Sequence, residues 1–138
     1  MYEANKALVQ RLIGDVDRGR LDAFEELCAP DYACHSAGSP TPLSREQHKQ
    51  EVLVFYAAFP DLHHLFEDMI AEGDRVAVRM TYEGTHKGSF QGIPPTGKRV
   101  SFPGILVLRI AGGKVSEMWR CIDLLDLLRQ LGATPVQQ

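Results

Sequence analysis

The chain has 138 residues, of which 44% are hydrophobic and 24% charged, and a formal net charge of -3 at pH 7. This length predicts one domain that can bury a core of its own, and the composition excludes extended disorder. Because the chain is slightly acidic and has no basic run, we expect no nucleic-acid partner.

The apolar runs are too short to cross a bilayer, the longest being residues 52–59 and 103–108. The chain does not open with a basic segment followed by an apolar stretch, so we expect no secretory signal, no membrane attachment and a cytoplasmic location. Cys28, Cys34 and Cys121 form no Cys-x-x-Cys pair. They are typical of reduced thiols rather than of a disulfide or a zinc site.

The first sixty residues carry apolar side chains at helical spacing. A first helix is predicted before Gly19, from the spacing of Leu8, Leu12, Ile13 and Val16. A second, short helix begins with an Asp-x-x-Glu capping box at Asp22 and stops at Pro30. A Ser-x-x-Gln capping box at Ser44 opens a third helix, which ends before Pro60.

After Pro60 the apolar period changes to two, which predicts strands. With glycine-containing turns at residues 72–74 and 111–114, four strands form an antiparallel meander, centred near Phe66, Val78, Val107 and Glu117. Pro103-Gly104 predicts a bulge that bends the sheet. A short helix from Leu124 to Leu131 ends at Gly132.

Helices followed by antiparallel strands predict an α+β fold in which the helices cover one face of the sheet. A curved sheet has a concave face, which is expected to hold a pocket. The long loop of residues 84–97 is expected to border that pocket, and the last helix to plug one end of it.

Several short motifs follow one another along nearly the whole chain: Asp31-Tyr32-x-x-His35, Phe59-Pro60-Asp61-Leu62, Gly84-Thr85-His86, Gly92-Ile93-Pro94-Pro95-Thr96-Gly97, Trp119-x-x-x-Asp123 and Gln130-Leu131-Gly132. In this order they resemble the SnoaL-like polyketide cyclases and ester cyclases of the NTF2-like superfamily. The resemblance implies one cone-shaped α+β domain over residues 1–138, with a curved antiparallel sheet wrapped around N-terminal helices. It also implies an apolar cavity, no cofactor and frequent dimerisation.

The resemblance assigns the role of general base to Asp123, which would take a proton from carbon beside a carbonyl before an intramolecular aldol closure. A carboxylate in an apolar cavity suits this role, because burial raises its pKa toward the working pH. Trp119 would share the strand face of Asp123 and form a wall for a flat substrate. Alternatively, Asp123 only caps the last helix, and accepting backbone N–H bonds would then lower its pKa.

Two further residues could hold the substrate's oxygen. The resemblance favours His35 as proton donor or carbonyl ligand, although it could instead brace its loop. Met118 stands where the cyclases commonly have a histidine, and Arg109 on the preceding strand could bind an enolate oxygen. The alternative places Arg109 in solvent or in a subunit interface.

The remaining candidates are mostly wall residues. The cavity wall is expected to include Phe55, Tyr56, Phe59, Met80, Tyr82, Phe102 and Ile105. His86 either gates the pocket or braces the loop, and His48 fits core packing better than catalysis. His63 and His64 are neighbours in a strand and point to opposite faces, so they cannot share a metal, and no metal site is predicted.

The leading hypothesis is a cofactor-free acid–base enzyme of the polyketide-cyclase kind, which acts on a small apolar carbonyl compound and dimerises through the outer face of its sheet. A ketosteroid-isomerase-like or epoxide-hydrolase-like enzyme stays open as an alternative. So does a non-catalytic ligand-binding or dimerisation module, in which Asp123 is only a helix cap. A base in an otherwise apolar cavity would favour the enzyme. A cone whose interior is filled by side chains would favour the non-catalytic module.

Overall fold

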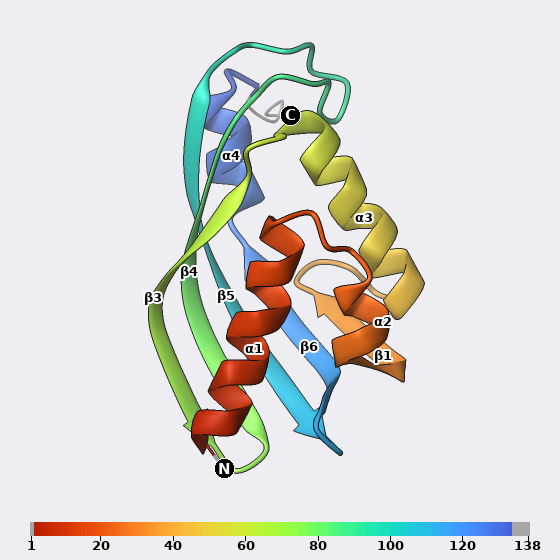
Figure 1. Cartoon of the computed structure of the whole chain (residues 1–138). Helices are drawn as coiled ribbons and strands as arrows, with labels where there is room; N and C mark the ends of the chain where they lie inside the picture. The colour runs from red at the N-terminus through yellow and green to blue at the C-terminus, as the bar shows by residue number, and fades with distance from the viewer. Residues whose placement is uncertain (1, 134–138) are drawn as a thin grey trace.

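A computed structural model describes residues 2–133 of the protein as helices packed on one curved sheet (Figure 1). The elements in chain order are α1 (Tyr2–Asp17), α2 (Ala23–Leu27), β1 (Cys28–Ser36), β2 (Leu43–Ser44), α3 (Arg45–Ala58), β3 (His63–Glu72), β4 (Arg75–Thr85), β5 (Arg99–Ala111), β6 (Lys114–Ile122) and α4 (Leu124–Gln130). Among the helices of this range, none combines the length and apolar character that crossing a membrane requires.

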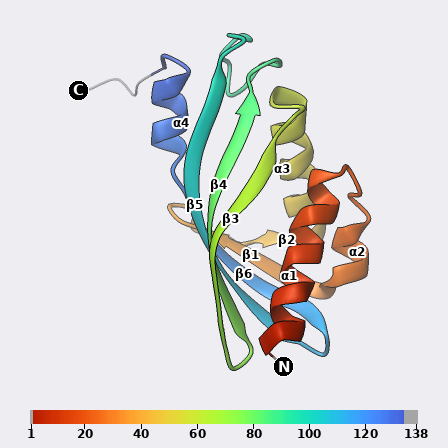
Figure 2. The ribbon, with the colours of Figure 1, turned by 60° about the vertical axis from the view of Figure 1, so that its left-hand side comes forward.

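The six strands form a single sheet in the order β2-β1-β6-β5-β4-β3. The predicted meander of β3 to β6 is confirmed, and β1 extends it as a parallel neighbour of β6, so the sheet is mixed rather than wholly antiparallel. Figure 2 shows α1, α2 and α3 on one side of the sheet and α4 on the other. The helices therefore enclose the concave face, as predicted.

The core lies between that face and the helices, because alternate side chains of each strand point inward. On β4 and β5 the buried side chains are every second residue, among them Val76, Val78, Met80, Tyr82, Phe102, Leu106 and Leu108. The helix α1 covers them with an apolar stripe of Val9, Leu12, Ile13 and Val16. This inner set of positions decides which polar side chains can reach the interior.

The helix boundaries follow the predicted signals with one exception. Ser44 and Gln47 form the reciprocal capping box that opens α3, and Gly132 adopts a φ of 82° just beyond α4. The predicted capping box of the second helix is wrong, since Asp22 makes no side-chain capping bond. That helix ends at Leu27, and Pro30 lies within β1.

One prediction about the strands needs correction. Pro103-Gly104 forms no bulge, because β5 pairs with β4 without a register shift there and its pairing with β6 begins only at Gly104. The register shifts lie elsewhere, in the pairings of β1 and β5 with β6 and in β3 between Phe66 and Asp68. Because the shift in β3 adds one residue, the side chains that point inward change from even-numbered to odd-numbered positions. Met69 therefore packs on the core, whereas Ile70 is 67% exposed.

Gly104 is required for a close approach rather than for a turn. A Cβ at this position would clash with the ring of Tyr82, which belongs to the neighbouring strand. We expect Gly104→Ala to lower the free energy of unfolding by about 1–3 kcal/mol, the usual cost of overpacking a core. Gly14→Ala is the control, because its Cβ meets only the flexible end of Arg18. Urea denaturation measures both, and equal stability of the two variants would contradict this account.

Candidate functional site

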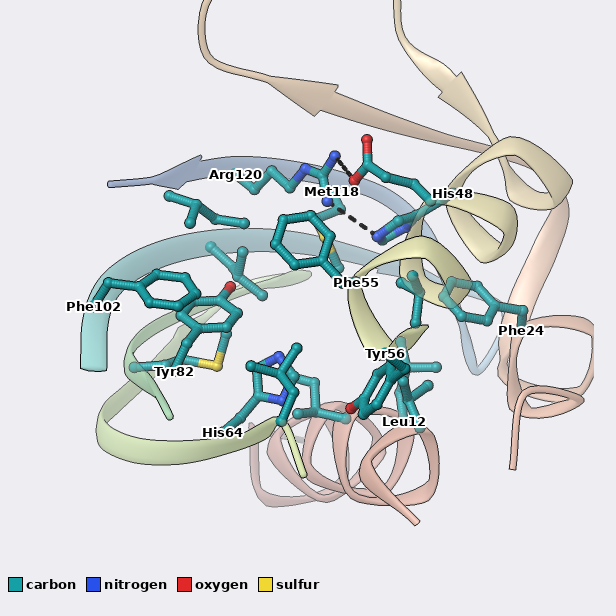
Figure 3. A pocket seen from close by; sticks show the side chains of 18 residues that line it. Leu12, Phe24, His48, Phe55, Tyr56, His64, Tyr82, Phe102, Met118 and Arg120 are labelled. Atoms are coloured by element: carbon teal, nitrogen blue, oxygen red, sulfur yellow. Dashed lines mark hydrogen bonds and ion pairs between the residues drawn. The ribbon is translucent and has the colours of Figure 1, made fainter. Parts of the chain in front are cut away.

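An apolar cavity of about 90 Å³ lies between α1, α3 and the concave face of the sheet (Figure 3). Its wall consists of Leu12, Ile13, Val16, Phe24, His48, Glu51, Val52, Phe55, Tyr56, Leu62, His64, Met80, Tyr82, Phe102, Leu106, Met118, Arg120 and Ile122. In the view of Figure 3, Arg120 and His48 lie on one side of Phe55, and His64 and Tyr56 on the other. The cavity is thus apolar along most of its wall and has polar side chains at two opposite ends.

A wider hollow of about 380 Å³ adjoins this cavity. The two share Glu51, Phe55, Arg120 and Ile122 in their walls. The hollow is bordered by residues 36–39, which begin at the last residue of β1, and by Phe90 and Gln91 of the loop between β4 and β5. The prediction that this long loop borders a pocket is therefore confirmed for the outer hollow, whereas α4 reaches the hollow only through Leu124 and does not plug the inner cavity.

Arg120 forms the charged end of the cavity. Its side chain is only 11% exposed, and it is held from three directions: Nε donates to Ser36 Oγ at 2.7 Å, Nη1 lies 3.4 Å from His48 Nε2, and Nη2 is ion-paired with Glu51. A guanidinium has five N–H bonds. Two of them thus have no partner within residues 2–133 and are free to meet a ligand oxygen.

His48 links Arg120 to the core through a chain of hydrogen bonds. Because Arg120 can only donate, His48 Nε2 accepts and His48 Nδ1 carries the hydrogen. Nδ1 then donates to the Tyr32 hydroxyl at 3.0 Å, which donates to Met118 Sδ at 3.6 Å. Burial, with the charge of Arg120, lowers the pKa of His48 to about 3. His48 is therefore neutral and uses both of its ring nitrogens.

A second polar cluster lies at the other end, around the carboxylate of Asp17. Asp17 Oδ1 accepts from His64 Nδ1 at 2.6 Å and from the Tyr56 hydroxyl at 2.6 Å, while Oδ2 accepts the backbone N–H of His64 at 2.9 Å. Burial acts to raise the pKa of Asp17, but the hydrogen bonds from the ring and backbone of His64 and from the Tyr56 hydroxyl outweigh it and hold the pKa below its usual range. The carboxylate is therefore ionised at neutral pH.

The sequence predictions place part of the wall correctly. Phe55, Tyr56, Met80, Tyr82 and Phe102 all line the cavity. Three others do not. Phe59 is fully buried against the rings of His86 and Phe90, and His86 is buried in the same cluster, where its Nδ1 accepts from the backbone N–H of Thr96. Ile105 is 53% exposed.

Asp123 does not lie in the cavity, and the expected placement of its carboxylate there is wrong. The residue is exposed and forms the N-cap of α4, where its side chain accepts the backbone N–H of Asp126 at 2.9 Å. The first turn of a helix has free N–H groups, and an Asp before Leu-Leu-Asp satisfies one of them. The geometry of Asp123 therefore agrees with the alternative in which this residue caps the last helix.

His35, Arg109 and Trp119 also lie outside the cavity, on the outer face of the sheet. His35 Nε2 is 2.6 Å from Glu117 Oε2, and Arg109 Nε donates to Glu117 Oε1 at 3.2 Å. Trp119 stacks on His35, and the guanidinium of Arg75 lies 5.0 Å from its ring centre. The inner residues of β6 are Met118, Arg120 and Ile122, so neighbouring odd-numbered residues point outward.

The sequence reasoning missed Arg120 and His64 as polar residues of the cavity. Arg120 alternates along its strand with the apolar residues Met118 and Ile122, and this alternation could have indicated that its side chain points inward. For His64 the signal was its parity with Leu62, but its partner Asp17 is distant in sequence and carries no motif. Within residues 2–133, no three His, Cys, Asp or Glu side chains gather closely enough to hold a metal.

A curved sheet around a helix-covered cavity defines an NTF2-like cone, and comparison with known proteins agrees. AclR, a candidate hydroxylase from Streptomyces galilaeus, has a crystal structure with a TM-score of 0.90 and 34% identity, covering 98% of this chain and 100% of AclR. IdmH, a candidate polyketide cyclase from Streptomyces antibioticus, has a TM-score of 0.84 and 31% identity, covering 94% of this chain and 99% of IdmH.

The family is shown by sequence as well. A family model described as SnoaL-like polyketide cyclase matches residues 7–131. The aklanonic acid methyl ester cyclase DauD of Streptomyces sp. (strain C5) is 31% identical over 128 residues, 91% of this chain and 80% of DauD. The nogalonic acid methyl ester cyclase of Streptomyces nogalater is 30% identical, over 88% of this chain and 92% of that enzyme. The chain belongs to the SnoaL-like polyketide cyclase family, and the prediction of a cyclase-type enzyme is confirmed at the level of the family.

The neutral His48 predicts how stability depends on pH. The unfolded chain binds a proton at His48 near pH 6.5, whereas the folded protein does so only near pH 3. Stability therefore falls as pH drops between these values, by about 1.4 kcal/mol per pH unit. From pH 7 to pH 5 this histidine costs about 2 kcal/mol. Asp17 does not contribute in this window, because a lowered carboxyl pKa loses its stabilisation only in more acidic solution.

We expect His48→Gln to flatten this slope, measured as the difference in urea unfolding free energy between pH 7 and pH 5. His63→Gln is the control, because His63 is 40% exposed. An unchanged slope in His48→Gln would show that the folded protein protonates His48 in the ordinary range.

Proposed function

We propose that this protein is a polyketide cyclase that closes a ring by an intramolecular aldol reaction of a β-dicarbonyl compound. The observation that carries the proposal is the guanidinium of Arg120, fixed at the junction of an apolar cavity and a wider hollow. The family and the relatives that act on aklanonic and nogalonic acid methyl esters support the same reaction class.

Arg120 suits the charge that this chemistry creates. Removing a proton from carbon between two carbonyls places negative charge on an enolate oxygen, and a donor that is already positioned stabilises it without reorganising. Ser36, His48 and Glu51 fix the guanidinium before the substrate arrives. The apolar wall strengthens the attraction, because little water competes for the charge.

The cavity volumes indicate how such a substrate lies. An engineered protein cavity of about 150 Å³ binds benzene, so the inner cavity of about 90 Å³ admits only a small reacting arm. A fused ring system then occupies the outer hollow of about 380 Å³. Arg120 and Phe55 line both spaces and would contact the substrate where arm and rings join.

A second candidate function comes from AclR, which is described as a candidate hydroxylase and shares 34% identity with this chain. The two reactions differ in mass balance. An aldol closure leaves the mass of the substrate unchanged, whereas hydroxylation adds one oxygen atom and needs an oxidant. Mass spectrometry of the product therefore separates them.

We expect the purified protein to convert aklanonic acid methyl ester or a related β-ketoester into a cyclic isomer, followed by chromatography with mass detection. Arg120→Lys is expected to lower kcat/KM by about 10²–10³-fold, because a lysine cannot hold the same fork of contacts while binding the enolate. Arg11→Lys is the matched control, because Arg11 is an exposed arginine of α1 that pairs with Glu26 and lies outside the walls of both the cavity and the hollow. Full activity of Arg120→Lys, or a product heavier by one oxygen, would contradict the proposal.

We also propose that the outer face of the sheet pairs with a second copy of the chain. Ile105 is 53% exposed there, and Arg79 and Cys121 lie opposite it on the neighbouring strands. Trp119 and the ion pairs of Glu117 lie further along the same face. An exposed apolar centre with charges around it is typical of an interface.

Sedimentation velocity tests this pairing. We expect a dimer for the wild-type chain and a monomer for Ile105→Glu, because an unpaired carboxylate in the centre of the interface is costly. Leu53→Glu is the control, since Leu53 is an exposed apolar residue of α3 in the helical layer. A monomeric wild-type chain would refute the pairing.

A further inference from the structure

His64 presents one free ring nitrogen to the cavity. Its Nδ1 lies 2.6 Å from Asp17 Oδ1, and a carboxylate can only accept, so Nδ1 carries the hydrogen. The opposite nitrogen, Nε2, is then a bare acceptor in the neutral ring. It has no hydrogen-bond partner within the described chain, 2–133, although His64 lines the cavity and its side chain is only 13% exposed.

The ring is fixed on several sides. The backbone N–H of His64 donates to Asp17 Oδ2, so one carboxylate holds both the strand and the ring. Tyr82 packs edge-on at 4.6 Å between ring centres, and Tyr56 shares the oxygen of Asp17 that faces the imidazole. His64 is therefore oriented before any ligand enters.

The other polar groups of the cavity wall are unsuited to accept a proton. Glu51 is engaged in its ion pair with Arg120, and His48 uses both ring nitrogens. Burial raises the pKa of both Tyr56 and Tyr82, so their hydroxyls stay protonated. Asp17 does not line the cavity, and its carboxylate is occupied by three hydrogen bonds from Tyr56 and His64.

We propose that His64, oriented by Asp17, is the general base and acid of the cyclisation, with its Nε2 as the atom that carries the proton. This inference rests on the proposed function and adds a catalytic pair that the sequence motifs do not contain. His64 is the catalytic residue, and Asp17 is a positioning residue. The apolar cavity between His64 and Arg120 separates the proton acceptor from the group that binds the oxygen.

The reaction needs no external proton donor or acceptor, because the proton taken from carbon is returned to the product. The carbon between two carbonyls gives its proton to His64 Nε2, and the electron pair of the C–H bond becomes the enolate held by Arg120. The enolate carbon attacks a further carbonyl of the same molecule, other than the two that flank it, and forms the new C–C bond as the C=O π pair moves to oxygen. The resulting alkoxide takes the proton from Nε2, so the ring returns to its neutral form. Asp17 stabilises the imidazolium in between and keeps its own charge.

The test compares His64→Gln with His63→Gln. The neighbouring His63 points away from the cavity, with its Nδ1 against the backbone oxygen of Asp61. We expect His64→Gln to lower kcat by about 10²–10⁴-fold with little change in KM, the usual contribution of a general base. The acidic limb of the pH profile of kcat/KM should disappear as well. His63→Gln should keep both.

Two further measurements separate catalysis from folding. Imidazole added to His64→Ala should restore part of the turnover, which a merely structural role would not allow. Asp17→Asn should lower kcat and, in nitrogen NMR of the imidazole, reduce the population with hydrogen on Nδ1. Wild-type turnover together with an active His64→Gln that keeps its acidic limb would overturn the role of His64 while leaving the cyclase intact. Absence of turnover in the wild type would instead refute the proposed function and the base with it.

Discussion

One carboxylate ties together three elements that are far apart in the chain. Asp17 stands at the last residue of α1, where a negative charge is unfavourable because the end of the helix is itself negative. It is stabilised there by hydrogen bonds from Tyr56 on α3 and from the ring and backbone of His64 on β3. A buried carboxylate without such partners would cost several kcal/mol. The packing of α1 and α3 on the sheet therefore depends on this cluster.

The same cluster also makes the two ends of the cavity chemically different. Asp17 leaves the free nitrogen of His64 at one end, and the contacts of Ser36, His48 and Glu51 leave free N–H bonds of Arg120 at the other. The charge of Arg120 is paired with Glu51, and the charge of Asp17 is stabilised by three hydrogen bonds, so neither charge is left without partners in the apolar interior. A substrate whose reaction moves a proton from carbon and places charge on oxygen matches both ends.

The fold could be predicted from local signals, but the site could not. The capping box at Ser44 and the alternation along β4 are properties of neighbouring residues, and both were recognised. On β5 both faces carry apolar residues, with Leu106 inside and Ile105 outside, so the pattern alone does not say which face is inner. Arg109 shares the outer face with Ile105, and Trp119 shares the face of Asp123, so both lie outside the cavity and Arg120 lines it instead. The pair of Asp17 and His64 depends on tertiary contact, which no motif records.

A crystal structure with a non-cyclisable β-ketoester analogue would test the account most directly. We expect the analogue's oxygen on the guanidinium of Arg120, and its central carbon about 3–3.5 Å from Nε2 of His64, the distance of a reacting pair. Density for the analogue beside Asp123, or on the outer face near His35, with the inner cavity unoccupied, would contradict the account.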